Sequence, residues 1–299
     1  MPVSAKRKVP SENFRLTRAC LRARMHAVVL SDDILSAVFL WLGAKELKCA
    51  SRIYAVGGWT GQRNCASVET YDPLVDRWVS APSLLTERSG LGVTVSEAGV
   101  LLAAGGWGGD GLDYLASVEA FDPRQEKWEL LPDLLSPRHC PGVASFEHWL
   151  YVSGGLPGHA LSRLASVERL NLNNRGATWE MVTPMLMARY RHSLAVLGGY
   201  LYAVGGETAT AENGALVVTS SVERYDPAAN VWQSVAPLCH PRMSHAVAVF
   251  DGCLLALGGF DGASWLSSAE RYCPATNSWE EMPMPGFFPR CAQGLTVCS

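Results

Sequence analysis

The apolar positions of this chain fall into short runs, and five of these runs lead into a pair of glycines. The most regular copy reads Leu-Tyr-Ala-Val-Gly-Gly at 201–206 and Ser-Val-Glu-Arg-Tyr-Asp-Pro at 221–227, followed by Trp232 and Arg242. Each copy predicts four short strands: strand a, such as 246–250; strand b, the run into the glycines; strand c, which carries Val-Glu-Arg-Tyr; and strand d, which carries the tryptophan. One such sheet cannot bury both of its faces, so the copies must pack against one another.

The spacing of the copies indicates the architecture. The glycine pairs begin at residues 57, 105, 154, 205 and 258, so they lie 48, 49, 51 and 53 residues apart. A period of about 50 residues with a glycine pair and a late tryptophan is typical of the kelch repeat, one blade of a β-propeller. The sequence therefore predicts an all-β chain with a propeller of five kelch motifs in four-stranded blades over residues 51–299. The strand-d tryptophans are predicted to be structural and to pack between blades: Trp78, Trp128, Trp179, Trp232 and Trp279.

The two ends of the repeat array complement each other. The first copy begins at strand b, and the last copy ends with a segment at 290–298 that matches strand a. An open blade would leave unpaired backbone donors and acceptors at its edge. We therefore expect the C-terminal strand, at 293–297, to close the first blade by lying beside 53–56.

Residues 1–50 form an N-terminal extension in this interpretation. Lys6-Arg7-Lys8 begins a basic arm, for which a disordered tail, a nuclear-localisation-like cluster and a mitochondrial presequence are the alternatives. Ser31-Asp32-Asp33 has the composition of a helix start, which predicts a short amphipathic helix over 32–47. Acidic residues interrupt the apolar stretch at 27–44, which makes it too short to span a bilayer. Residues 30–47 also resemble, in part, the first half of an F-box.

Charge and cysteine content restrict the partners and the compartment. The net charge is −3 overall. It is +6 over residues 1–52 and −9 over the rest, and an acidic propeller is a poor candidate for nucleic-acid binding by counterion release. The nine cysteines contain no Cys-x-x-Cys pair, a pattern that favours a reducing compartment, the cytoplasm or the nucleus. We expect neither nucleic acid nor membrane as a partner.

Loop lengths predict which face binds a partner. From the glycine pair to strand c the distance is 10, 12, 12, 16 and 10 residues, whereas the other spacings are nearly constant. In an antiparallel four-stranded blade the b–c and d–a loops emerge on one face, and variable loops on a constant scaffold carry binding specificity. An arginine at one offset in every repeat is expected to be structural and to pair with the strand-c glutamate. The candidate partner-binding residues of these loops are Trp59, Trp107, His139, Tyr190, Arg191, Glu207, Met243, Phe260 and Trp265.

The motifs of common enzyme classes are missing from the sequence. It contains no phosphate-binding loop, no Gly-x-Ser-x-Gly elbow and no His-Glu-x-x-His. We therefore expect no catalytic residue, no metal site, no cofactor and no enzyme activity. Kelch oxidases, which hold copper, are a less favoured alternative because no ligand set stands out.

The sequences of the repeats resemble those of the kelch-like family, whose members combine BTB, BACK and kelch domains. The matching segments are Val-Glu-Arg-Tyr-Asp-Pro, Pro-Arg-x-x-His and Leu-Tyr-Ala-Val-Gly-Gly. The resemblance implies a substrate-recognition subunit of a cullin–RING E3 ubiquitin ligase, with a protein substrate or degron peptide on the propeller. This chain departs from the family in having five repeats rather than six and no BTB or BACK domain, so a ligase would be reached through a module absent from or truncated in it. An F-box would use a different cullin through an adaptor. An actin-binding or scaffold kelch protein without a ligase link is the alternative function.

Overall fold

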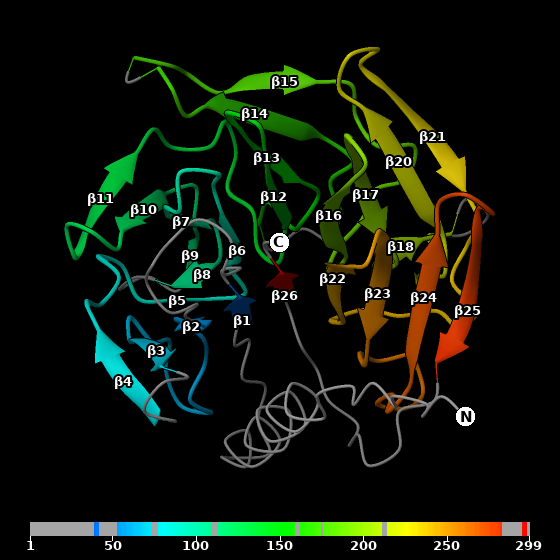
Figure 1. The fold of residues 1–299 in the computed structure, drawn as a ribbon, viewed down its shortest axis with the longest axis horizontal. Coiled ribbons are helices and arrows are strands. Elements are labelled where there is room, and N and C mark those ends of the chain that lie inside the picture. Colours follow the sequence, from blue (N-terminus) through cyan, green and yellow to red (C-terminus); the bar gives the residue numbers. More distant parts are fainter. Residues whose placement is uncertain are drawn as a thin grey trace, which may run out of the picture. The chain divides into compact units, whose positions relative to one another are not determined.

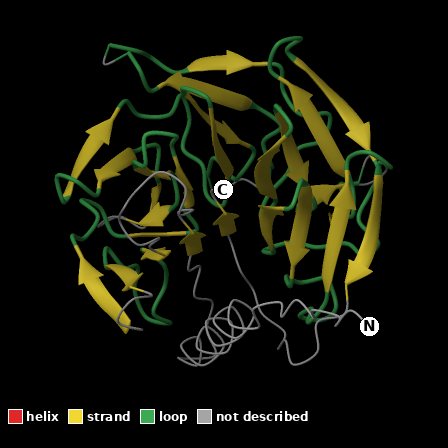
Figure 2. Ribbon diagram, viewed as in Figure 1, coloured by secondary structure: helices red, strands yellow, loops and turns green. Residues whose placement is uncertain are grey.

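Five sheets of four or five short strands surround a common centre, and four of these sheets are antiparallel throughout (Figure 1). The computed structural model describes residues 39–41, 53–72, 77–108, 113–158, 162–174, 176–210, 214–282 and 295–297. The chain divides into two compact units, Met1–Asp33 and Ile34–Ser299, and all described residues belong to the second. Strands and loops make up the described part, which contains no helix (Figure 2). The fold is all-β, as the pattern of apolar residues predicts.

Each sheet is one blade, with strand a nearest the centre and strand d at the rim (Figure 1). The a strands are β1 (Phe39–Trp41), β6 (Gly92–Val95), β12 (Gly142–Phe146), β16 (Ser193–Leu197) and β22 (Ala246–Phe250). The b strands are β2 (Ile53–Val56), β7 (Leu101–Ala104), β13 (Trp149–Ser153), β17 (Tyr200–Val204) and β23 (Cys253–Leu257). The c strands are β3 (Val68–Asp72), β10 (Val118–Asp122), β14 (Val167–Asn171), β20 (Val222–Asp226) and β24 (Ala269–Cys273). The d strands are β4 (Arg77–Ala81), β11 (Lys127–Leu131), β15 (Glu180–Val182), β21 (Val231–Val235) and β25 (Ser278–Met282).

Residue types follow burial from the inner to the outer strands. Strand β7 reads Leu-Leu-Ala-Ala and is buried at all four positions. Strand β11 reads Lys-Trp-Glu-Leu-Leu, and Trp128 is its one fully buried residue. A strand covered on both faces is apolar throughout, whereas a strand at the rim alternates.

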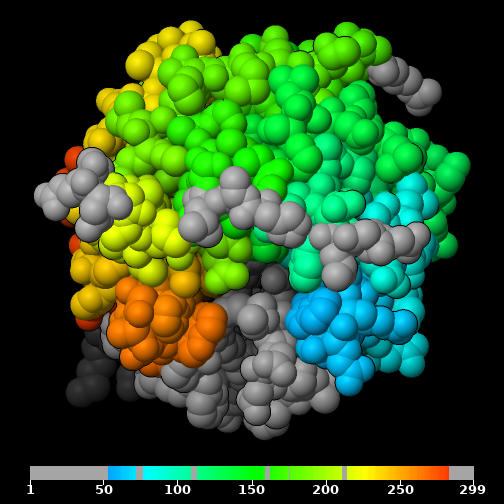
Figure 3. Space-filling view, turned by 180° about the vertical axis from the view of Figure 1, so that it is seen from behind, coloured from blue at the N-terminus to red at the C-terminus, as the bar shows by residue number. Residues whose placement is uncertain are grey.

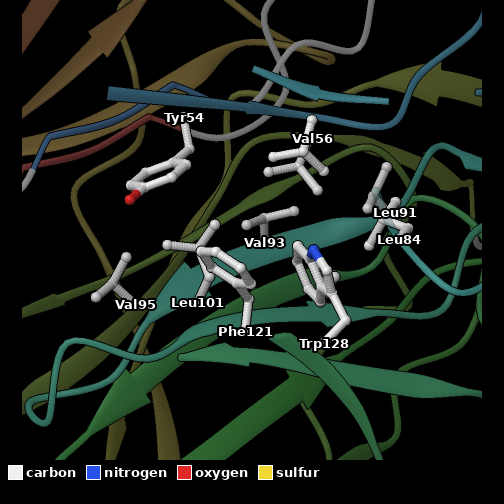
Figure 4. Close-up of a cluster of buried hydrophobic side chains, with 11 residues drawn as sticks. Tyr54, Val56, Leu84, Leu91, Val93, Val95, Leu101, Phe121 and Trp128 are labelled. Carbon is white, nitrogen blue, oxygen red and sulfur yellow. The ribbon is translucent and has the colours of Figure 1, made fainter. Parts of the chain in front are cut away.

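Neighbouring blades pack face to face through buried apolar clusters. The cluster between the first two blades joins Tyr54 and Val56 of β2 to Val93, Leu101 and Trp128 of the second blade (Figure 4). Corresponding clusters join the second blade to the third, the third to the fourth and the fourth to the fifth. These contacts bury the sheet faces that a single blade would expose.

The strand-d tryptophans extend from one blade toward the segment before it. The indole N–H of Trp128 donates to Pro82 O at 2.8 Å. Three others donate in the same way to a carbonyl of the segment before their own blade: Trp179 to Pro132 O at 2.8 Å, Trp232 to Thr183 O at 2.9 Å and Trp279 to Ala236 O at 3.0 Å. Trp78 is half-buried, with its ring 5.5 Å from that of Tyr71. These positions between blades are what a structural role of the tryptophans requires. The structural role itself stays a prediction.

The repeated arginine connects consecutive blades. The carbonyl of Arg189 accepts from the N–H of Gly155 in the third blade at 2.8 Å, while its guanidinium enters the fourth blade. There it donates to Gly205 O at 2.7 Å, to Ser221 O at 2.9 Å and to the carboxylate of Glu223 at 2.8 Å. The equivalent buried ion pairs are Arg88–Glu119, Arg138–Glu168 and Arg242–Glu270. The expected pairing with strand-c glutamates is therefore present in four repeats, between adjacent blades.

The glycine pairs lie where this connection brings two backbones together. Gly105 has φ +65, and a Cβ there would lie 2.3 Å from Arg138 O. Any side chain would collide with backbone that is itself fixed, so the position requires glycine.

The joint between the first and fifth blades differs from the prediction. The C-terminal strand β26 (Leu295–Val297) does join the first sheet, but it pairs in parallel with β1, and β1 pairs antiparallel with β2. The expected position beside 53–56 is thus wrong, because residues 39–41 occupy it. Strand β26 also lies next to β22 of the fifth blade, so it connects the two ends of the array.

Strand β1 also corrects the prediction for the N-terminal extension. The helix predicted over 32–47 is wrong at 39–41, which are extended. The partial resemblance of residues 30–47 to an F-box stays a prediction. The free edges of β2 and β26 supply backbone partners that a local sequence pattern does not reveal. The rest of residues 1–50 lies outside the described residues.

Two histidines are buried near the centre. His192 and His245 occupy one repeat offset, at which the second blade has Leu91. Burial lowers the pKa of His245 to about 3, and the charges of Arg242 and Arg189 act in the same direction. Burial likewise lowers the pKa of His192 well below its usual value. Neither ring nitrogen of His245 has a hydrogen-bond partner in the described part of the chain.

We expect the chain to lose stability between pH 7.5 and pH 5, and the His245→Leu variant to lose less. The unfolded chain protonates His245 near pH 6.5, whereas the folded chain does not, so acid favours the unfolded state below that pH. At pH 5 the protonation of His245 in the unfolded chain lowers the free energy of unfolding by about 2 kcal/mol, because pH 5 is about 1.5 units below the unfolded pKa. Urea midpoints of both proteins at the two pH values measure the difference. The control is His240→Leu, which removes an exposed histidine, and equal pH slopes for wild type and His245→Leu would contradict the account.

Candidate protein-binding face

The b–c and d–a loops of adjacent repeats are joined into one surface. Strand β5 (Arg88–Ser89) pairs with β8 (Trp107–Gly108), which pairs in turn with β9 (Asp113–Tyr114). Single bridges make the same connection further along the chain, His139 with Leu156, Tyr190 with Glu207 and Met243 with Phe260. These loops therefore lie on a common face, which Figure 3 shows from behind the view of Figure 1. We call it the b–c/d–a face.

A chain of backbone hydrogen bonds runs from blade to blade at the centre of this face. The N–H of Cys140 donates to Gly90 O at 2.7 Å, that of Arg191 to Cys140 O at 3.3 Å, and that of Ser244 to Arg191 O at 2.9 Å. All four residues have φ between +50 and +57. The d–a loops are thereby held in one geometry, independent of their side chains.

Three of the predicted binding residues contact one another near the centre. The hydroxyl of Tyr190 lies 3.3 Å from His139 Nδ1, and the guanidinium of Arg191 lies 4.9 Å from the Tyr190 ring centre. Glu207 forms an ion pair with Arg163, which also faces the Tyr190 ring at 5.8 Å. This group crosses three repeats.

Burial at the centre of the face limits what Tyr190 can contact. The residue is 7% exposed, and burial raises the pKa of its hydroxyl far above the usual value, so it stays protonated. His139, Arg191 and Glu207 are half-buried. The structure therefore leaves Tyr190 little surface for a partner, and its assignment as an anchor stays a prediction.

The aromatic candidates lie in two groups away from Tyr190. Trp59 and Trp107 are half-buried, with ring centres 6.0 Å apart across the first two repeats. Phe260 and Trp265 lie 5.1 Å apart in the fifth repeat, and Trp265 is 45% exposed. Met243 is bridged to Phe260 and is half-buried. The structure brings the predicted residues onto one face but not into one cluster.

Two features of this face were missed by the sequence reasoning. The longest b–c loop forms a hairpin of β18 (Glu207–Ala209) and β19 (Leu216–Val218), which leaves Leu216 and Val217 exposed. The run Leu-Val-Val-Thr after a lengthened loop was the available signal, because such residues favour strands. Arg163 was missed because nothing in its own loop indicates a partner in the next one.

The part of the chain that the structure describes offers neither a metal site nor a helix that could cross a membrane. The described ranges contain no group of three or more His, Cys, Asp or Glu side chains placed to hold a metal ion. Nor does any helix in them have the length and apolar character needed to cross a bilayer.

Fold and face together define a repeat propeller with variable loops gathered on one side. The Kelch motif family matches residues 49–85, 88–135, 188–238 and 241–285, which make up more than half of the chain. The chain belongs to the kelch-repeat family and carries a kelch protein-interaction domain. Residues 136–187 lie outside the matched segments, yet they form a blade of the same kind.

Curated relatives connect the chain to the kelch-like proteins. Kelch-like protein 34 of Homo sapiens is 33% identical over 220 residues, which cover 73% of this chain and 25% of that protein. Kelch-like protein 36 of Bos taurus is 35% identical over 123 residues, 40% of this chain and 19% of that protein. The chain thus spans about a fifth to a quarter of the length of these relatives.

Among solved structures, one described as "Structure of YjhT" matches with a TM-score of 0.69. It is 12% identical and covers 86% of this chain and 99% of its own. At that identity the likeness concerns the fold alone. The predicted kelch β-propeller, related to the kelch-like family, is confirmed.

Proposed function

We propose that this chain is the substrate-recognition part of a cullin–RING E3 ubiquitin ligase and that it binds a protein substrate or degron peptide on its b–c/d–a face. The observation that carries the proposal is the interlocking of d–a and b–c loops across repeats. Four strand-like bridges and a chain of backbone bonds hold loops of different length on a rigid support. A pre-organised surface loses little entropy on binding, which favours affinity.

The ligase link rests on the likeness to kelch-like proteins, of which the chain matches the repeat region. In this proposal the chain itself catalyses nothing, needs no cofactor and contacts neither nucleic acid nor membrane. It acts in the cytoplasm or the nucleus. The cullin is reached through a module other than the propeller.

Purification of the full chain from cells after cross-linking tests both parts of the proposal. We expect the wild type to recover a cullin together with a ubiquitin-modified partner. Trp265→Ala should recover about thirty-fold less partner, because truncation of a binding anchor typically costs about 2 kcal/mol or more. Phe250→Ala is the matched control, since that aromatic residue is 63% exposed but lies at an a–b turn on the opposite face.

The outcomes separate the two parts. A partner lost with Phe250→Ala and retained with Trp265→Ala would place the site on the other face. A partner recovered without any cullin or ubiquitin would contradict the ligase role and leave the binding face in place. Circular dichroism of both variants establishes that each is folded.

A further inference from the structure

In the hairpin of β18 and β19, strand β19 has a backbone partner on one side only among the described strands. Strand β18 has backbone partners on both sides: its Glu207 exchanges N–H···O bonds with Tyr190, at 2.7 and 2.9 Å, and its opposite side pairs with β19. Strand β19 pairs with β18 alone among the described strands.

The alternation of an antiparallel pair shows which backbone groups of β19 face outward. Residues along such a pair alternately exchange hydrogen bonds and point away from the partner. Glu207 directs its N–H and C=O at Tyr190, so its opposite residue, Val218, is not hydrogen-bonded to β18. The bonds from Thr219 N–H to Gly206 O at 2.9 Å and from Thr210 N–H to Ala215 O at 2.8 Å fit this phase. The outward groups therefore belong to Leu216 and Val218, and no described residue bonds to them across that edge.

The side chains beside this edge are apolar and open. Leu216 is 43% exposed and Val217 is 39% exposed. Val218 lies close to the loop of the fifth repeat, where a Cβ on Gly262 would be 3.5 Å from its Cγ2. Figure 3 shows the two segments side by side, in yellow-green and orange, and the second carries Trp265. We call Leu216, Val218 and Trp265 the hairpin edge.

Apart from its short length of three residues, the hairpin edge lacks the features that usually prevent strand addition. Proteins protect exposed edges with lysine, proline, bulges or a covering segment. Strand β19 contains no charge and no proline, and the residues before and after it are Ala215 and Thr219. An extended peptide paired to such an edge gains main-chain hydrogen bonds, while alternate side chains supply specificity.

We propose that β19 binds an extended, uncharged segment of the partner protein by strand addition, with its backbone paired to Leu216 and Val218 and an apolar side chain set against Trp265. This deepens the proposed function and rests on the same face. A second copy of this chain fits the edge less well. A specific dimer buries about 1,200–2,000 Å² in total, and a three-residue edge alone supplies far less.

The test uses a phage-displayed library of linear twelve-residue peptides selected on the full chain. The strongest binder is synthesised, and its dissociation constant is measured by fluorescence polarisation. We expect N-methylation along the peptide to weaken binding at every second residue of the paired stretch and to have little effect between, because only alternate N–H groups face β19. Each sensitive position should cost about tenfold.

Two variants of the chain supply the matched comparison. Leu216→Pro removes the outward N–H and should weaken the peptide about tenfold or more, while the bonds to β18 remain. Leu216→Thr keeps that N–H and should weaken binding by about threefold, through lost apolar contact. Equal melting temperatures show that each variant is folded.

The contrary results are equally definite. A library that yields no binder, an N-methyl scan without a period of two, or Leu216→Pro binding like wild type would overturn the proposal. Concentration-dependent dimerisation lost in Leu216→Pro would also overturn it and assign the edge to a second copy. A peptide that binds the hairpin edge, in a chain that recovers no cullin, would support this inference while contradicting the ligase role.

Discussion

Arg189→Ala should lower the free energy of unfolding by about 3–5 kcal/mol, the loss typical of breaking a buried ion pair from one side. The Arg189 side chain is fully buried and that of Glu223 is 2% exposed, so the carboxylate left behind has no solvent to compensate it. The backbone N–H groups of Leu186 and Met187 still donate to Glu223, at 2.6 and 3.1 Å, but the positive charge is gone. The third and fourth blades also lose their connection through Gly205 and Ser221. Urea denaturation followed by tryptophan fluorescence measures the loss.

The control for this prediction is an ion pair of the same type at the surface. Arg271 and Glu280 have side chains that are 47% and 60% exposed, so Arg271→Ala should cost at most about 1 kcal/mol. The double variant Arg189→Met/Glu223→Leu should regain part of the loss, because it buries no unpaired charge. If Arg189→Ala and Arg271→Ala cost the same, the buried arginines do not hold the blades together.

The scaffold could be predicted from the sequence because its constraints repeat. A position such as Gly105 accepts only glycine, and the same backbone approach recurs in each blade, so glycine pairs reveal the period. The arginine and the strand-c glutamate likewise keep constant offsets, which is why their pairing could be expected. The position of strand β1 could not be predicted, because Asp32-Asp33 and the apolar residues after them favour a helix locally. Residues 39–41 are extended because the sheet supplies partners on both sides.

The sequence could predict which side of the propeller carries the candidate residues, but not which of them are exposed enough to bind a partner. Loop lengths and antiparallel topology placed all nine candidate residues on one side. Exposure depends instead on neighbours from other repeats. His139 and Arg163 lie against Tyr190, whereas Trp265 packs against Phe260 of its own repeat and remains open. Tyr190 and Trp265, two aromatic residues in loops of the same face, thus differ about sixfold in exposed fraction. The residue types alone do not predict this difference in exposed fraction.

Trp232→Ala should destabilise the chain by about 3–5 kcal/mol, the range for removing a buried aromatic side chain. Trp232 is buried in the cluster between the third and fourth blades, with its ring 5.1 Å from that of Tyr225. The variant loses this contact and the hydrogen bond to Thr183 O at 2.9 Å, and it leaves a cavity between two sheets. For a domain of this size the melting temperature should fall by roughly 6–20 °C. Trp232→Phe keeps a ring in the cluster and should lose about half as much or less.

Trp265→Ala is the matched control, because it removes the same side chain from an exposed loop position. Its melting temperature should stay close to that of the wild type, since a surface substitution changes stability by about 0.5 kcal/mol or less. The two variants therefore separate folding from binding: Trp232→Ala reduces the folded fraction, and Trp265→Ala reduces binding by folded molecules. If Trp232→Ala melted like wild type and yet lost the partner, the strand-d tryptophans would belong to a binding surface. The clusters between blades would then depend on the aliphatic residues of strands a and b.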